Sequence, residues 1–135
     1  MLESSSRTAP TPSFFATFTG LEITAIRRSV ARYAAQLGLT GEQLQDFVLA
    51  VNEIVTNAVM HGGGYGELRL WGAGKAVGCE VVDMGPGGAA EVAAGPAEAG
   101  GRGMRLARLL VDELHVVDSP TGTVVRLVTS LPVTG

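Results

Sequence analysis

Apolar and polar residues follow two periods along the first half of the chain. Over 13–19 the side chains alternate with a period of two, which predicts a strand. Over 22–37 and 40–61 the apolar residues recur at helical spacing, which predicts two amphipathic helices. A glycine follows each of these helices, Gly38 and Gly62, and marks the point where we expect it to end.

The second half of the chain predicts four more strands and a third helix. The strands are expected at 67–71, 76–82, 114–117 and 123–128, and the helix at 104–113. A glycine-containing turn separates the first two of these strands, as in a hairpin. A long stretch rich in Gly, Ala and Pro precedes the helix, and such stretches are usually lids, binding loops or disordered segments.

This order of elements predicts the fold class. It lacks the strand–helix alternation of a doubly wound parallel sheet, so we expect an α+β fold. The predicted arrangement is a two-layer sandwich, with a mixed, mostly antiparallel sheet and all helices on one face. The chain has 135 residues, of which 46% are hydrophobic, enough for one domain with its own core. We expect this domain over 13–135, after a disordered Ser/Thr/Pro-rich leader at 1–12.

Composition excludes several classes of function. Ten Lys and Arg stand against 13 Asp and Glu, and the net charge of -3 disfavours direct nucleic-acid binding. No apolar run approaches the ~20 residues that a membrane span needs, and the N-terminus lacks the pattern of a secretion signal. A cytoplasmic protein is expected. The single cysteine, Cys79, lies in an apolar run and is interpreted as a small buried hydrophobe rather than a reactive thiol.

The second predicted helix carries a stripe of polar residues. Glu53, Asn57 and His61 are four residues apart, so they share one face of that helix. A carboxylate and a carboxamide one turn apart offer two hard oxygen ligands, or one metal ligand and one general base. A solvated helix face has the same spacing, and a histidine at a helix end also serves as a partner of the helix dipole.

An acidic residue stands at the end of the strand predicted over 76–82. Asp83 is followed by Gly85 and Gly87, so a flat ligand could approach the backbone while the carboxylate accepts a hydrogen bond from its amino group. Asp83 could equally begin a turn. The glycines also fit a loose dinucleotide-binding fingerprint, but the strand–helix–strand unit that this fingerprint requires is missing.

Two further features precede the third helix and the last strand. Gly101, Arg102 and Gly103 stand before the helix, where exposed backbone N–H groups and the helix dipole favour a phosphate. A flexible linker would have the same composition. Thr123 follows Gly122 at the start of the last strand, where a threonine is ordinarily a good strand residue.

Taken together, in this order and approximate spacing, the four features resemble the N, G1, G2 and terminal Gly-Thr boxes of the GHKL ATPase superfamily. The closer resemblance is to its small bacterial anti-sigma-factor serine kinases. The similarity runs from about Phe14 to Leu131, nearly the whole chain. No phosphoaccepting histidine on a dimerisation hairpin is visible, which argues against a complete sensor histidine kinase.

The resemblance implies a site for ATP and Mg²⁺ between the second helix and a lid over 86–103. Asp83 would bind the adenine amino group with help from Thr123, Asn57 would hold Mg²⁺, and Glu53 would be the general base. The remaining nucleotide contacts that the resemblance implies are His61, Gly85, Gly87, Gly101, Arg102, Gly103 and Met104.

The resemblance also implies the partners. The protein would sequester an RNA polymerase sigma factor and phosphorylate a serine or threonine of an anti-anti-sigma antagonist of the STAS type, and it could form a homodimer. A non-catalytic module that binds ATP or a sigma factor is the alternative at this stage.

Overall fold

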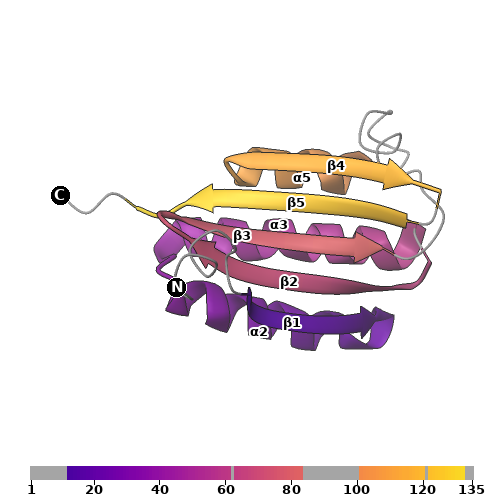
Figure 1. Ribbon diagram of the computed structural model, residues 1–135, viewed down its shortest axis with the longest axis horizontal. Helices are drawn as coiled ribbons and strands as arrows, with labels where there is room; N and C mark the ends of the chain where they lie inside the picture. Colours follow the sequence, from indigo (N-terminus) through magenta and orange to yellow (C-terminus); the bar gives the residue numbers. More distant parts are fainter. Residues whose placement is uncertain (1–11, 62, 84–100, 121, 133–135) are drawn as a thin grey trace, which may run out of the picture.

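A computed structural model describes residues 12–61, 63–83, 101–120 and 122–132 of the chain (Figure 1). Apart from Pro12, the predicted leader lies outside these residues, so its disorder stays a prediction. The elements, in chain order, are β1 (Pro12–Thr19), the short 3-10 helix η1 (Gly20–Glu22), α2 (Ile23–Gln36), α3 (Gly41–His61), β2 (Tyr65–Ala73), β3 (Ala76–Asp83), α5 (Gly101–Leu110), β4 (Glu113–Ser119) and β5 (Gly122–Ser130).

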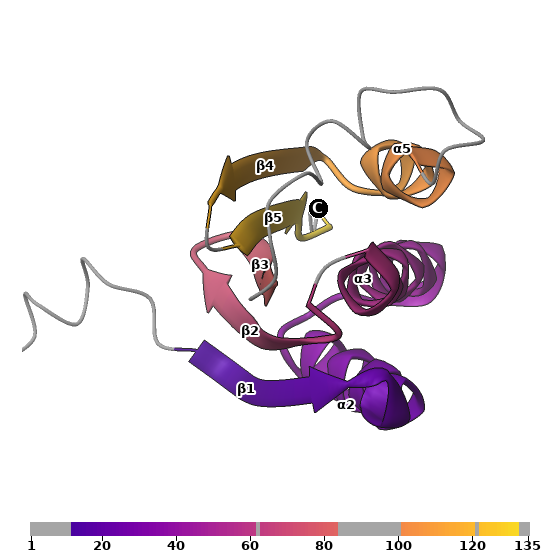
Figure 2. The same ribbon diagram turned by 90° about the vertical axis from the view of Figure 1, so that its right-hand side faces the viewer.

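The described strands form one five-stranded sheet in the order β1-β2-β3-β5-β4. Every neighbouring pair in this sheet is antiparallel. The helices α2, α3 and α5 cover one face, and α3 lies between the other two (Figure 2). The predicted α+β sandwich is confirmed. The prediction of a mixed sheet is wrong for the described strands, because β5 enters between β3 and β4 and runs opposite to both.

The core lies between the sheet and the helices. Along β5 every second residue is buried, and β3 has the same alternation near its end. The central helix α3 buries Phe47 completely and adds five further core residues. Cys79 is fully buried and unbonded, and burial, with a smaller contribution from the Glu80 carboxylate, raises the pKa of its thiol. This agrees with the interpretation of Cys79 as a packing residue.

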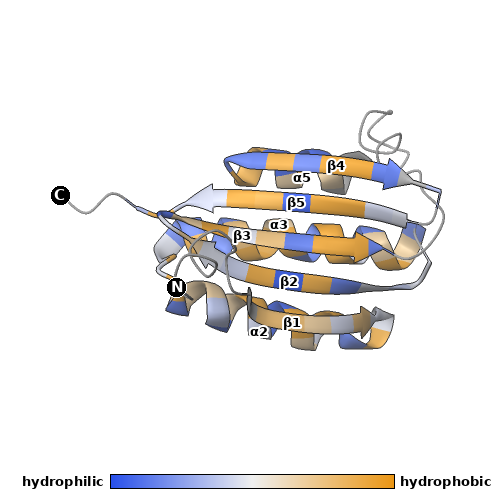
Figure 3. Ribbon diagram, viewed as in Figure 1, coloured by the Kyte–Doolittle hydropathy of each residue, from blue (hydrophilic) through white to orange (hydrophobic). Residues whose placement is uncertain are grey.

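The open face of the sheet carries a charged row across its centre, visible as a blue band in Figure 3. Arg69, Glu80 and Arg126 are cross-strand neighbours on β2, β3 and β5. The Glu80 carboxylate lies 3.6 Å from the guanidinium of Arg69 and 3.2 Å from that of Arg126. Long charged side chains at the sheet centre therefore cover backbone that no helix protects.

The third helix differs from its prediction at both ends. It begins at Gly101, so the glycines that we expected before the helix form its first turn. It ends at Leu110, and β4 starts at Glu113, which the apolar pattern had assigned to the helix. The reason is the backbone N–H of Asp112, which donates to the carbonyl of Val128 on β5 instead of to another helical carbonyl.

Candidate nucleotide site

The sequence-predicted site residues gather at one end of the molecule. The end of β3, the end of β4 and the beginning of β5 lie together at the right of Figure 1. The chain leaves α3 for β2 at this same end, and α5 begins there because it runs antiparallel to β4. The topology therefore brings together segments as far apart in the sequence as the end of α3 at His61 and the start of β5 at Gly122.

Three side chains form a row across the helix-covered face at this end. Thr123 on β5 is the cross-strand partner of Asp83 on β3 and of Asp118 on β4. Asp83 is 7% exposed and Thr123 is 2% exposed. Their side chains follow the core residues Val81 and Val125 along their own strands, so they extend the core face with polar groups.

The Thr123 hydroxyl donates its proton to Oδ1 of Asp118. Sequence reasoning did not single out Asp118. A signal was present, because Asp118 continues the alternation of the core-facing Leu114 and Val116, where a further apolar residue is expected. A charged residue at such a position indicates a role in hydrogen bonding and not in packing the core.

Asp83 also connects β3 to the end of α3. Its Oδ1 accepts a hydrogen bond from the backbone N–H of Gly63 at 3.2 Å. Its cross-strand neighbour on β2 is Gly66, where a Cβ would lie 2.4 Å from the carbonyl oxygen of Val82 and 2.9 Å from the ring of Phe18. Asp83 is thus a buried strand residue with a backbone donor, and it does not merely start a turn.

The polar stripe of α3 reaches toward the same end. Glu53 and Asn57 are partly buried, and His61, the last residue of the helix, is exposed. The Asn57 Nδ2 atom is buried and has no hydrogen-bond partner among the described residues. Buried polar atoms are normally paired, so an unpaired amide suits a partner that is not part of the described chain. This distinguishes Asn57 from a residue on a solvated helix face.

The side-chain oxygen of Asn57 is also of the kind that binds magnesium. Among the described residues, no group of three or more His, Cys, Asp or Glu could hold a metal ion. Mg²⁺ in nucleotide sites needs no such cage, because it takes one or two protein oxygens together with phosphates and water. The carboxamide oxygen of Asn57 can be one such oxygen, whereas its unpaired Nδ2 group is a hydrogen-bond donor and suits an anionic oxygen.

The first turn of α5 supplies backbone N–H groups. Gly101, Arg102 and Gly103 occupy that turn, where the N–H groups have no partner within the helix. Met104 is 1% exposed, with its side chain in the core, so any contact it makes with a nucleotide falls to its backbone. The predicted contacts Gly85 and Gly87, with the predicted lid up to 100, lie outside the described residues, as does the side chain of Arg102.

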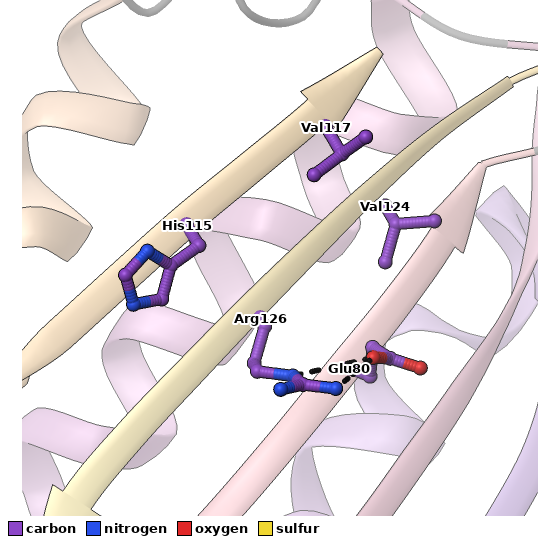
Figure 4. A pocket seen from close by; sticks show the side chains of 5 residues that line it. All are labelled: Glu80, His115, Val117, Val124 and Arg126. Atoms are coloured by element: carbon purple, nitrogen blue, oxygen red, sulfur yellow. Dashed lines mark hydrogen bonds and ion pairs between the residues drawn. The ribbon is translucent and has the colours of Figure 1, made fainter. Parts of the chain in front are cut away.

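A hollow lies on the opposite, open face of the sheet. Figure 4 shows Glu80, His115, Val117, Val124 and Arg126 around it, with Glu80 and Arg126 joined by their ion pair. Glu80 and Asp83 are three residues apart on one strand, so their side chains point to opposite faces. This hollow is therefore separate from the row that contains Asp83.

None of the described helices combines the length and the hydropathy needed to cross a membrane.

Comparisons with known proteins identify the family of this chain. Residues 19–129 match the family model of the histidine kinase-like ATPase domain. The anti-sigma F factor of a Thermoanaerobacter species is 35% identical, over 75% of this chain and 80% of the relative. That of Caldanaerobacter subterraneus is 34% identical over the same shares.

A solved structure shows the same fold. The RsbU and RsbW domains of a Mycobacterium tuberculosis protein align with a TM-score of 0.64 and 21% identity, over 89% of this chain and 32% of that one. This chain thus spans about a third of that structure. The family model covers most of the chain and the relatives are similar along most of their own length, so this protein belongs to the histidine kinase-like ATPase domain family, and the resemblance to anti-sigma factors is confirmed.

Proposed function

We propose that this protein is an ATP-dependent serine kinase that acts as an anti-sigma factor. It would bind a sigma factor and transfer the γ-phosphate of ATP to a serine or threonine of an anti-anti-sigma protein of the STAS type. The observations that carry the proposal are the burial of Asp83 at the end of β3 and, near the end of α3, the buried amide nitrogen of Asn57, which has no hydrogen-bond partner among the described residues. The anti-sigma F factors among the relatives support the choice of a sigma factor as partner.

In this proposal the row on the sheet that contains Asp83 binds the adenine base, and helices α3 and α5 bind the phosphates. Asp83, already oriented by the Gly63 N–H, accepts a hydrogen bond from the adenine amino group. The backbone N–H groups at the start of α5 face the anionic oxygens. The carboxamide oxygen of Asn57 would hold Mg²⁺, which would supply positive charge next to the phosphate oxygens.

Glu53 is the proposed general base. It stands one turn before Asn57 on α3, partly buried, and its carboxylate accepts the proton of the attacking hydroxyl. His61 stands one turn beyond Asn57 and extends the same stripe toward the nucleotide. A rigid helix core, with Ile54, Val55 and Ala58 buried, fixes the spacing of these groups.

The proposal places the protein in the cytoplasm, where sigma factors act, without direct contact to nucleic acid. It includes a homodimer, as the resemblance implies. Sedimentation of the purified chain at two concentrations tests the dimer independently of the chemistry.

The direct test of the kinase is transfer of radiolabelled γ-phosphate. We expect wild-type protein and Mg²⁺-ATP to label a serine or threonine of an anti-anti-sigma protein recovered by affinity from the native cell. Phosphopeptide mapping identifies the acceptor. If the wild-type protein binds ATP and the sigma factor but labels no partner, it is instead a non-catalytic regulatory module.

Asp83→Asn is expected to weaken ATP binding by about 1–3 kcal/mol, because it removes a charge-assisted hydrogen bond to the adenine amino group. Titration calorimetry measures the change. Glu80→Gln is the matched control, since Glu80 lies on the same strand but on the open face, and its ATP affinity should equal that of the wild type. Unchanged affinity in folded Asp83→Asn would remove Asp83 from the adenine site.

Asn57→Ala is expected to lower the affinity for ATP in the presence of Mg²⁺ and to leave the affinity in EDTA nearly unchanged. Calorimetry under both conditions measures the difference. Asn52→Ala is the control, because Asn52 lies on the same helix but lines the groove between α2 and α3. Equal losses with and without Mg²⁺ would point to a packing defect and against a magnesium ligand.

A further inference from the structure

Asp118 determines which hydrogen bonds Thr123 can offer to a ligand. A threonine hydroxyl has one proton to donate and two lone pairs to accept with. In this structure the Thr123 hydroxyl donates that proton to Asp118 Oδ1. Toward any third group, the Thr123 hydroxyl can therefore act only as a hydrogen-bond acceptor.

The strand register places the Thr123 hydroxyl, as a hydrogen-bond acceptor, beside Asp83. Asp83, Thr123 and Asp118 are consecutive cross-strand neighbours on β3, β5 and β4, with Thr123 in the middle. Side chains directly opposite each other on antiparallel strands are close enough to contact the same functional group of a ligand. Because Thr123 is 2% exposed, water does not readily compete for its hydroxyl.

An ionised carboxylate is also an acceptor without a proton to donate. The wall formed by Asp83 and Thr123 therefore offers acceptors only. A purine with an amino group at position 6 matches it, while a purine with an oxygen there faces it with a further acceptor. Without Asp118, the Thr123 hydroxyl could rotate and donate to that oxygen.

We propose that Asp118 is a positioning residue that selects 6-amino over 6-oxo purine nucleotides by taking the proton of Thr123. This inference rests on the proposed function, because it places the base beside Asp83. It adds to that function a source of specificity on β4, a strand that the sequence motifs do not include.

The test compares the affinities for ATP and inosine triphosphate by titration calorimetry on the full chain. The two bases differ at position 6, an amino group against an oxygen, and at N1, which carries a proton only in the 6-oxo base. The measured quantity is the ratio of the two dissociation constants. In Asp118→Ala we expect the preference for ATP to fall about three- to tenfold, as the loss of one oriented hydrogen bond predicts. A purely structural role for Asp118 would weaken both nucleotides equally and leave the ratio unchanged.

Two further variants sharpen the test. Thr123→Val removes the hydroxyl with little change of shape and should lower the preference to about the level of Asp118→Ala. In the Thr123→Val background, Asp118→Ala should then change the ratio no further. Asp112→Ala is the matched control, since its carboxylate accepts from the Ser130 N–H at the other end of β5, and it should keep the wild-type ratio.

The outcomes distinguish a failure of the proposed function from a failure of the role of Asp118. Wild-type protein that binds neither nucleotide would overturn the proposed function and this inference with it. Normal ATP binding with an unchanged ratio in Asp118→Ala would overturn the inference alone. If Asp118→Ala does not fold, an unchanged ratio in Thr123→Val overturns it equally.

Discussion

Glu53→Gln should bind ATP like the wild type but transfer its γ-phosphate about 10² to 10⁴ times more slowly. Glutamine keeps the size of the side chain and loses only the ability to take a proton, and a positioned general base contributes rate factors of that order. Single-turnover transfer of labelled phosphate to the anti-anti-sigma protein gives the rate. Calorimetry on the same preparation gives the affinity.

The control for this prediction is Glu42→Gln. Glu42 lies in the first turn of the same helix, is exposed and should keep the wild-type transfer rate. Equal transfer by Glu53→Gln and the wild type would remove Glu53 from the reaction. The base would then be sought elsewhere on the stripe, with His61 as the next residue to test.

Phe47→Ala should destabilise the fold by about 3–5 kcal/mol and lower the melting temperature by roughly 10–20 °C. Phe47 is completely buried where α3 meets the sheet, so its truncation leaves a cavity that the surrounding side chains fill only in part. Urea unfolding monitored by circular dichroism measures the change in free energy. Because α3 also carries Glu53 and Asn57, ATP binding should weaken as the midpoint falls.

Leu49→Ala is the matched control for the core. Leu49 belongs to the same helix but is 41% exposed, so its truncation removes much less buried surface. We expect a loss below about 1 kcal/mol, in line with surface substitutions. Comparable losses for the two variants would mean that α3 does not pack as described.

The sequence predicts most elements because their signals are local. Every strand and every α-helix among the described residues was expected, since each has its own period and its own glycine or turn boundary. The start of α5 was missed because glycines weaken the helical signal where they stand, yet a first turn needs no side-chain packing to form. Its end was missed because a contact with the distant Val128 determines it.

Some residues of the candidate site could likewise be predicted from local sequence, and others could not. The spacing of Glu53 and Asn57 can be read from one helix, and Asp83 stands at a visible strand end. Asp118 could not be assigned a partner, because its pairing with Thr123 depends on the register of β4 against β5. The order of the strands in the sheet is likewise a property of the whole fold, and no local pattern encodes it.

The position of β5 has a consequence for how this protein is made. β5 is the last of the described strands in chain order but lies inside the sheet, between β3 and β4. Until synthesis has passed residue 130, β3 is an unpaired edge and β4 has no neighbour, so the nascent chain exposes strands that can pair wrongly. The same strand brings Thr123 beside Asp83. A growing chain therefore cannot use ATP to stabilise itself until β5 has been synthesised and has paired with β3.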